Sequence, residues 1–155
     1  MSKTNPVLPT NIKEEHIEIV NDLLHQMLFG LRLDRPGTWS SKLEGILPVD
    51  LHTVKLVSER PNIILKEIRD ELKVPHSTLT SIINRLEKHG VLRRVISSRD
   101  RRSYGLELTP KGKQLQEEHD RVDRMIATKL LGTLDNERER ETLIKLLSKV
   151  GQRLD

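Results

Sequence analysis

Residues 65–110 have the sequence LKEIRDELKVPHSTLTSIINRLEKHGVLRRVISSRDRRSYGLELTP, and this stretch decides the fold. Apolar residues recur at helical spacing over 65–72 and again over 76–89. Pro75 separates the two runs because proline breaks the first helix, and its fixed φ suits the opening of the second. Gly90 follows the second run and suits the left-handed conformation that closes a helix. The pattern predicts two helices joined by a tight turn.

A β-hairpin is expected directly after this helix pair. Residues 91–96 form an extended apolar run, and residues 104–108 alternate between apolar and polar side chains, with Tyr104 on the apolar side. Residues 97–103 contain no apolar side chain, so they are expected to project into solvent or onto a partner. Two helices followed by a hairpin predict a winged helix-turn-helix.

The N-terminal part of the chain predicts an arm and two further helices. Residues 1–11 contain two prolines and are expected to form a flexible arm. A first helix with apolar residues at helical spacing ends near Gly30. Residues 32–48 mix Pro, Gly and Ser around Trp39, which predicts an irregular connection of unusual length. The second helix is expected to start after Asp50, its predicted N-cap.

The C-terminal part predicts two more helices. Thr109 and Pro110 are suited to the N-cap and first position of a long helix, which Gly132 is expected to end or bend. A last helix begins at about Asp135 and has the four-three-four apolar spacing that is typical of a helix seam. The residues of this spacing are Leu143, Leu147, Val150 and Leu154.

The composition bounds the class of protein. The chain has 155 residues, of which 35% are hydrophobic and 32% charged, so it is long and apolar enough to fold as one domain. It has no cysteine, which excludes disulfides and thiol chemistry. No apolar run reaches the roughly 18 residues of a membrane span, and the N-terminus lacks an apolar signal core. We therefore expect a cytoplasmic protein that does not enter a membrane.

The residue pattern does not favour an enzyme or a binder of single strands. The six histidines form no HxxxH or HxH pair, and no glycine-rich phosphate loop occurs, so neither a metal site nor a cofactor is expected. Proteins that bind single-stranded nucleic acid stack bases on aromatic side chains, and this chain has only Phe29, Trp39 and Tyr104.

The positive charge is concentrated in one region. The net charge of the chain is +4, and between residues 76 and 102 seven basic residues stand against only two acidic ones, Glu87 and Asp100. A basic cluster of this kind favours a polyanionic partner such as double-stranded DNA. The seven residues are Arg85, Lys88, Arg93, Arg94, Arg99, Arg101 and Arg102.

Two sets of polar residues are candidates for DNA contact. A helix in the major groove needs short polar side chains on its exposed face, and the second helix of the pair has them. A basic hairpin tip can reach phosphates or a narrow minor groove. The candidates on the helix are Ser77, Thr78, Thr80, Ser81, Asn84, Arg85 and Lys88, and those on the hairpin are Ser98, Arg99, Asp100, Arg101 and Arg102.

The order and spacing of four motifs resemble the multiple-antibiotic-resistance regulator (MarR) family over roughly residues 50 to 112. The motifs are STLT at 77–80, LEKHGVLRR at 86–94, DRR at 100–102 and LTPKG at 108–112. The resemblance implies a dimer of winged-helix subunits that usually represses transcription and often responds to small aromatic or phenolic ligands. It also implies that residues 77–85 lie in the recognition helix. By the same resemblance, Asp100 and Arg102 match the wing-tip pair whose arginine enters the minor groove.

These features predict a mainly α fold with a β-hairpin wing and N- and C-terminal dimerisation helices. Residues 50–108 are expected to bind DNA, and residues 12–31 and 109–155 to form the dimerisation region. The predicted function is that of a homodimeric regulator that binds a pseudo-palindromic operator in double-stranded DNA. The alternative is a winged helix used for protein–protein contacts without specific DNA binding. A module of that kind would not require the excess of positive charge in residues 76–102.

Overall fold

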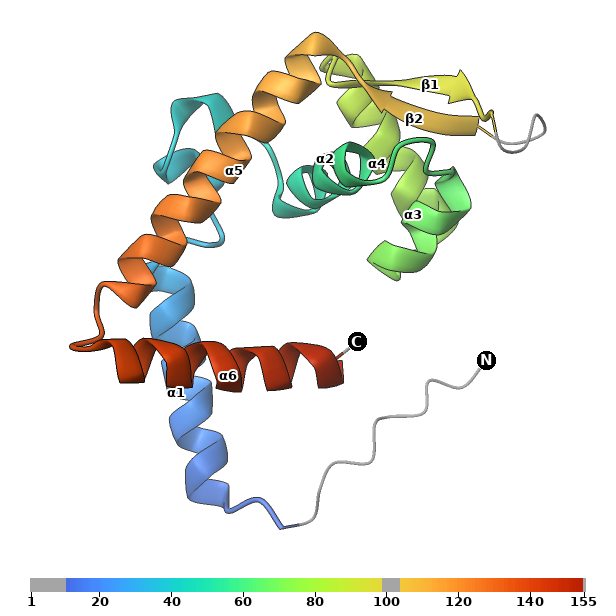
Figure 1. The fold of residues 1–155 in the computed structure, drawn as a ribbon. Coiled ribbons are helices and arrows are strands. Elements are labelled where there is room, and N and C mark those ends of the chain that lie inside the picture. The colour runs from blue at the N-terminus through green and yellow to red at the C-terminus, as the bar shows by residue number, and fades with distance from the viewer. Residues whose placement is uncertain (1–10, 99–103, 155) are drawn as a thin grey trace. The chain divides into compact units, whose positions relative to one another are not determined.

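The computed structural model describes residues 11–98 and 104–154, which fall into two compact units divided between Asp34 and Arg35. The prediction of a mainly helical fold with a β-hairpin wing is confirmed (Figure 1). The first unit contains α1 (Glu14–Gly30). The second contains the 3-10 turns η1 (Pro36–Thr38) and η2 (Ser41–Leu43), helices α2 (Pro48–Glu59), α3 (Leu65–Leu72) and α4 (His76–Lys88), strands β1 (Leu92–Ile96) and β2 (Tyr104–Leu108), and helices α5 (Pro110–Leu131) and α6 (Glu137–Leu154).

Helix α2 begins earlier than the sequence predicted. Its N-cap is Leu47 and its first residue is Pro48, whose fixed φ suits the first position of a helix. The prediction of Asp50 as the N-cap was therefore wrong. Asp50 stands in the first turn, where its carboxylate accepts a hydrogen bond from the backbone N–H of Leu47 at 3.4 Å. Acidic residues are favourable there because of the helix dipole.

The turn between α3 and α4 follows from three backbone positions. Lys73 ends α3 in the left-handed conformation, with φ of 52°. Pro75 is the N-cap of α4, directly before the helix predicted over residues 76–89. Gly90 follows α4 with φ of 67°, which confirms its predicted left-handed role. The apolar side of α4 is fully buried and consists of Leu79, Ile82, Ile83 and Leu86.

The hairpin is antiparallel, and its register pairs Leu92 with Leu108 and Ile96 with Tyr104. Leu106 is buried in the core, whereas Ile96 and Tyr104 are 71% and 56% exposed. The prediction of Tyr104 on a buried side was therefore wrong. Tyr104 and Ile96 form the pair nearest the tip of the hairpin, and the core does not extend that far.

The first turn of α5 is fixed to the end of α4. Thr109 is the N-cap, as predicted, and its Oγ1 accepts a hydrogen bond from Gly112 N at 3.1 Å. The same hydroxyl donates to the carbonyl of Gly90 at 2.6 Å. Gly112 packs so closely that a Cβ atom on it would lie 2.0 Å from the carbonyl oxygen of Val91. Helix α5 therefore starts from a rigid junction with the helix-turn-helix.

The long connection before α2 is ordered by contacts with α5 and the core. Leu43 of η2 is fully buried. Trp39 packs against the core, and the ammonium of Lys129 lies 5.3 Å from the centre of its ring. Lys42 lies 3.8 Å from the carboxylate of Glu118 on α5. Residues 35–48 of this connection are thus part of the second unit, which their Pro, Gly and Ser content did not indicate.

Helices α1 and α6 bury none of their residues in the single chain. Arg140 attaches α6 to the end of α5 by donating to the carbonyls of Leu131 and Leu134 at 3.2 and 3.1 Å. The large apolar residues exposed on α6 are Ile144, Leu146, Leu147, Val150 and Leu154, and those on α1 include Ile17, Val20, Leu24 and Phe29. Within the described ranges, every helix is too short or too polar to span a membrane.

Candidate nucleic-acid interface

The outer side of α4 has a nearly continuous polar surface. The predicted residues Ser77, Thr78, Ser81, Asn84 and Lys88 are all exposed, while Thr80 and Arg85 are half-buried. The side opposite them packs into the core. Helical periodicity therefore places the short polar side chains together on the face that is open to a partner.

Two hydroxyl groups on this face donate to their own helix. Ser81 Oγ donates to the carbonyl of Ser77 at 3.1 Å, and Thr80 Oγ1 donates to the carbonyl of His76 at 2.9 Å. A hydroxyl that donates its proton in this way keeps lone pairs for an incoming donor. On a base edge such donors are the amino groups of cytosine and adenine.

Arg85 is held by a carboxylate that is distant from it in the sequence. Its Nη2 and Nε donate to the two carboxylate oxygens of Asp50 at 2.5 and 2.9 Å. Asp50 is 1% exposed, and the hydrogen bond to it raises the pKa of the Arg85 guanidinium above its usual value. The pair joins α4 to the first turn of α2, so most of the Arg85 guanidinium is committed within the subunit.

Arg94 of β1 connects the hairpin to α4. Its Nη2 donates to Asn84 Oδ1 at 2.8 Å, and its Nη1 donates to the carboxylate of Glu87. The backbone N–H of Arg94 also donates to Glu87 at 3.2 Å. Asn84 and Glu87 are three residues apart, so both lie on the side of α4 that faces this strand.

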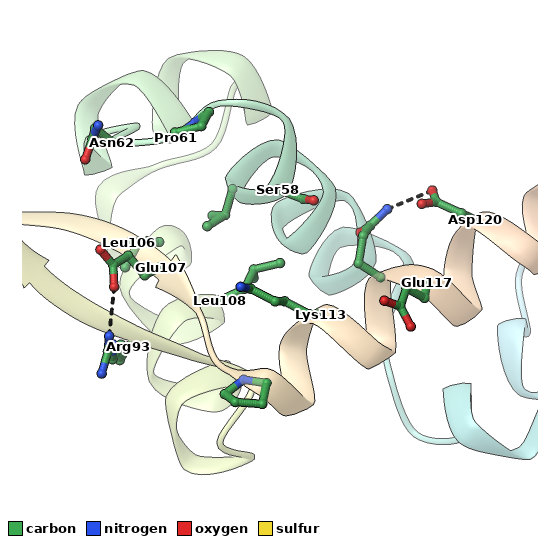
Figure 2. Close-up of a pocket in the computed structure, with 13 residues that line it drawn as sticks. Ser58, Pro61, Asn62, Arg93, Leu106, Glu107, Leu108, Lys113, Glu117 and Asp120 are labelled. Carbon is green, nitrogen blue, oxygen red and sulfur yellow. Dashed lines mark hydrogen bonds and ion pairs between the residues drawn. The ribbon is translucent and has the colours of Figure 1, made fainter.

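The excess of positive charge in residues 76–102 is therefore partly neutralised by carboxylates that the fold brings close to the arginines. Arg93 pairs with Glu107 across the hairpin at 3.0 Å (Figure 2), and Arg85 and Arg94 also have carboxylate partners. Lys88 has no hydrogen bond or ion pair with any residue in the described ranges. Among the residues that the structure describes, Lys88 is thus a positive charge of α4 that no carboxylate neutralises.

The wing tip is only partly within the described residues. Ser98 is exposed, but Ser97, which was predicted to lie in the projecting tip, is buried. The predicted contacts Arg99, Asp100, Arg101 and Arg102 lie outside the described residues, so their roles stay predictions.

A pocket of about 760 Å³ lies between the end of α2, strand β2 and the first turns of α5 (Figure 2). Its charged side chains have both signs, and two of them, Arg93 and Glu107, form an ion pair. Gln116 donates to Asp120 at 2.8 Å, and its buried Oε1 has no partner among the described residues. No cluster of three potential metal ligands occurs in the described part of the chain.

Comparison with known proteins connects this geometry with one family. The MarR family model matches residues 47–104, which include α2, α3, α4 and β1. A protein of Thauera aromatica, assigned as a transcriptional regulator of the hcr operon, is 28% identical over 111 residues, which are 69% of this chain. The match covers 64% of that relative, which is less than two thirds of its length.

Solved structures share the fold over most of the chain. Streptococcus pneumoniae FabT, solved in complex with DNA, has a TM-score of 0.77 and 27% identity, covering 89% of this chain and 96% of FabT. Apo MarR from Escherichia coli has a TM-score of 0.66 and 26% identity, covering 84% and 96%. Streptomyces coelicolor PcaV, solved with its natural ligand, has a TM-score of 0.61 and 15% identity, covering 97% and 100%.

Proposed function

The chain belongs to the MarR family of winged helix-turn-helix transcriptional regulators, and we propose that it represses transcription by binding specific double-stranded DNA as a homodimer. The observation that supports this most directly is the exposed polar face of α4 beside a hairpin that is bonded to it. A helix of this kind fits the major groove, and the adjacent hairpin then lies along the phosphate backbone. FabT, which has this fold at 27% identity, was solved bound to DNA.

The proposal divides the predicted residues by role. Ser77, Thr78, Thr80, Ser81 and Asn84 read base edges, since they are short and polar. Lys88 and the wing-tip residues Ser98, Arg99, Arg101 and Arg102 supply sequence-independent affinity through phosphates and the minor groove, and Asp100 orients one of these arginines. Arg85 keeps Nη1 outside its pair with Asp50 and contributes at most one phosphate contact.

The homodimer is proposed from the uncovered apolar residues of α1 and α6. Monomeric proteins rarely leave apolar patches of this kind in water. Residues 12–31 and 109–155 therefore form the dimerisation region of the proposal, and residues 50–108 bind DNA. A two-fold dimer reads a pseudo-palindrome whose half-sites are about one helical turn apart.

Selection of bound fragments from random DNA, followed by mobility-shift titration, tests the function. We expect one enriched pseudo-palindromic sequence. Asn84→Ala or Ser81→Ala should weaken binding to it by about 1 to 3 kcal/mol and leave binding to random DNA nearly unchanged. Equal losses on both kinds of DNA would show that these residues are not base readers. If selection enriches no sequence, the chain is better described as a protein–protein interaction module.

A small aromatic or phenolic effector stays a prediction of the family resemblance. PcaV was solved with its natural ligand. Its sequence is only 15% identical to this chain, so the comparison supports a shared fold and not a shared ligand. Addition of aromatic acids and phenols to the preformed DNA complex tests the prediction. Release of the selected DNA by one class of these compounds is the expected result, and a complex unaffected by all of them contradicts it.

A further inference from the structure

We propose that Arg94 determines which bases Asn84 reads, by holding the amide oxygen of Asn84 toward β1 and directing its amide N–H groups to DNA. The inference rests on the proposed function, because it concerns the same face of α4. The bond that carries it joins Arg94 Nη2 to Asn84 Oδ1 at 2.8 Å. A guanidinium can only donate, so the Asn84 atom that faces it must be the oxygen.

The orientation of the amide changes the base that fits it. Asparagine pairs with adenine by two hydrogen bonds, accepting from N6 with its oxygen and donating to N7 with its nitrogen. The bond to Arg94 takes one of the two lone pairs of Oδ1 and turns this oxygen toward β1, so the group of Asn84 that we expect to face a base is the amide NH₂. An amide NH₂ group fits a base whose major-groove edge has hydrogen-bond acceptors and no donor. These bases are guanine, with O6 and N7, and thymine, with O4. We therefore expect Asn84 to favour guanine or thymine over adenine.

The position of Arg94 is set before DNA binds. Glu87 holds the guanidinium through its carboxylate and also accepts from the backbone N–H of Arg94 at 3.2 Å. Both side chains are mostly covered, so water screens this ion pair less than a fully exposed one. The guanidinium thus spans Asn84 and Glu87 across one turn of α4. Arg94 acts on recognition as a positioning residue, through Asn84.

The neighbouring Arg93 offers a matched control. It has the same charge, precedes Arg94 on the same strand and pairs with Glu107 of β2 instead of with α4. Replacement of either arginine removes one positive charge from the hairpin. Only the loss of Arg94 frees the amide of Asn84.

The experiment compares base preferences by selection from random DNA, followed by titration of sites with each of the four base pairs at the position that Asn84 reads. The proteins are the wild type, Arg94→Ala, Arg93→Ala and the double variant Arg94→Ala/Glu87→Ala, which keeps the net charge. We expect the wild type to prefer guanine or thymine at one position in each half-site. In both variants that lack Arg94, preference should shift toward adenine by about tenfold, in the range of one bidentate base contact. Arg93→Ala should keep the wild-type preference.

Asn84→Ala, alone and combined with Arg94→Ala, decides whether the effect passes through Asn84. The shift should disappear when Asn84 is absent. If Arg94→Ala and the double variant keep the wild-type preference, or if the shift persists without Asn84, the inference is wrong while the proposed function stands. A wild type that selects no sequence refutes the proposed function, and this inference with it.

Discussion

Asp50 in the first turn of α2 and Arg85 in α4 form a two-bonded ion pair, with N–O distances of 2.5 and 2.9 Å, although they are 35 residues apart in the chain. The carboxylate is almost completely buried, whereas the guanidinium is 34% exposed. This asymmetry matters because a charge left without its partner is costly in proportion to its burial. The pair links the first turn of α2 to α4.

Removal of Arg85 should therefore cost more than neutralisation of Asp50. Arg85→Met leaves a buried carboxylate uncompensated, and we expect it to lower the free energy of unfolding by about 2 to 4 kcal/mol. Asp50→Asn leaves an arginine that can reach water, and its cost should be nearer 1 kcal/mol. Urea unfolding at pH 7 and one fixed protein concentration measures both values.

Arg93→Met is the control for this comparison, because its pair with Glu107 is exposed. Its cost should not exceed about 1 kcal/mol. If Asp50→Asn destabilises more than Arg85→Met, burial of the carboxylate is not the dominant contribution.

The contact between Gly112 and the carbonyl of Val91 gives a second prediction. Any Cβ at position 112 would lie 2.0 Å from backbone oxygen, so α5 must shift away from the end of α4. We expect Gly112→Ala to lower the free energy of unfolding by about 3 kcal/mol, at the upper end for overpacking. In α6, a Cβ on Gly151 meets no atom within 4 Å, so Gly151→Ala should stabilise by up to about 1 kcal/mol. Thermal unfolding of the two variants should change in opposite directions.

The sequence predicted the elements well because their signals are local. Pro75, Gly90 and the Thr109-Pro110 step mark helix boundaries through their own backbone preferences, without reference to distant residues. Asp50 was misplaced because a preceding proline also starts helices, and the sequence does not say which of the two signals dominates.

The connections within the site were not predicted, because they depend on packing. Asp50 meets Arg85 and Glu107 meets Arg93 only after α2 and β2 pack beside α4 and β1. A count of charges along residues 76–102 treats these arginines as free, since both carboxylates lie outside that window. Similarly, the composition of residues 32–48 indicates a loop and gives no sign that Leu43 is buried in the core.

Glu118 provides a prediction on pH. The hydrogen bond from Arg121, followed by one from Ser40 and the charge of Lys42, lowers the pKa of the Glu118 carboxyl from 4.5 to about 2. The folded protein therefore binds fewer protons at this site than the unfolded chain between these values. The stabilisation is complete above about pH 4.5 and is lost as the pH falls toward 2.

Comparison of the wild type with Glu118→Gln by urea unfolding at several pH values tests this. The difference in free energy of unfolding should be constant above about pH 5 and shrink as the pH falls below 4.5. Because the other carboxyl groups titrate in both proteins, the difference isolates Glu118. A difference that grows on acidification would contradict the lowered pKa.

Disruption of the apolar stripe on α6 should separate dimerisation from folding. Leu147 and Val150 are each about half exposed, and α6 buries no residue in the single chain. Leu147→Glu therefore removes no core contact within the subunit, and the helix should still form. In a dimer, the same substitution would place an uncompensated charge in an apolar interface, which is strongly unfavourable. We expect a folded monomer.

Light scattering at micromolar concentration measures the mass, and circular dichroism measures the helical content. The wild type should have twice the mass of one chain and Leu147→Glu the mass of one chain, with similar helical content. Ser148→Glu introduces the same charge at the next position, outside the apolar stripe, and should remain dimeric. Since two half-sites must be bound together, Leu147→Glu should also lose affinity for the full operator and retain that for a single half-site. A wild-type monomer would refute the homodimer, and a dimeric Leu147→Glu would show that the interface lies elsewhere.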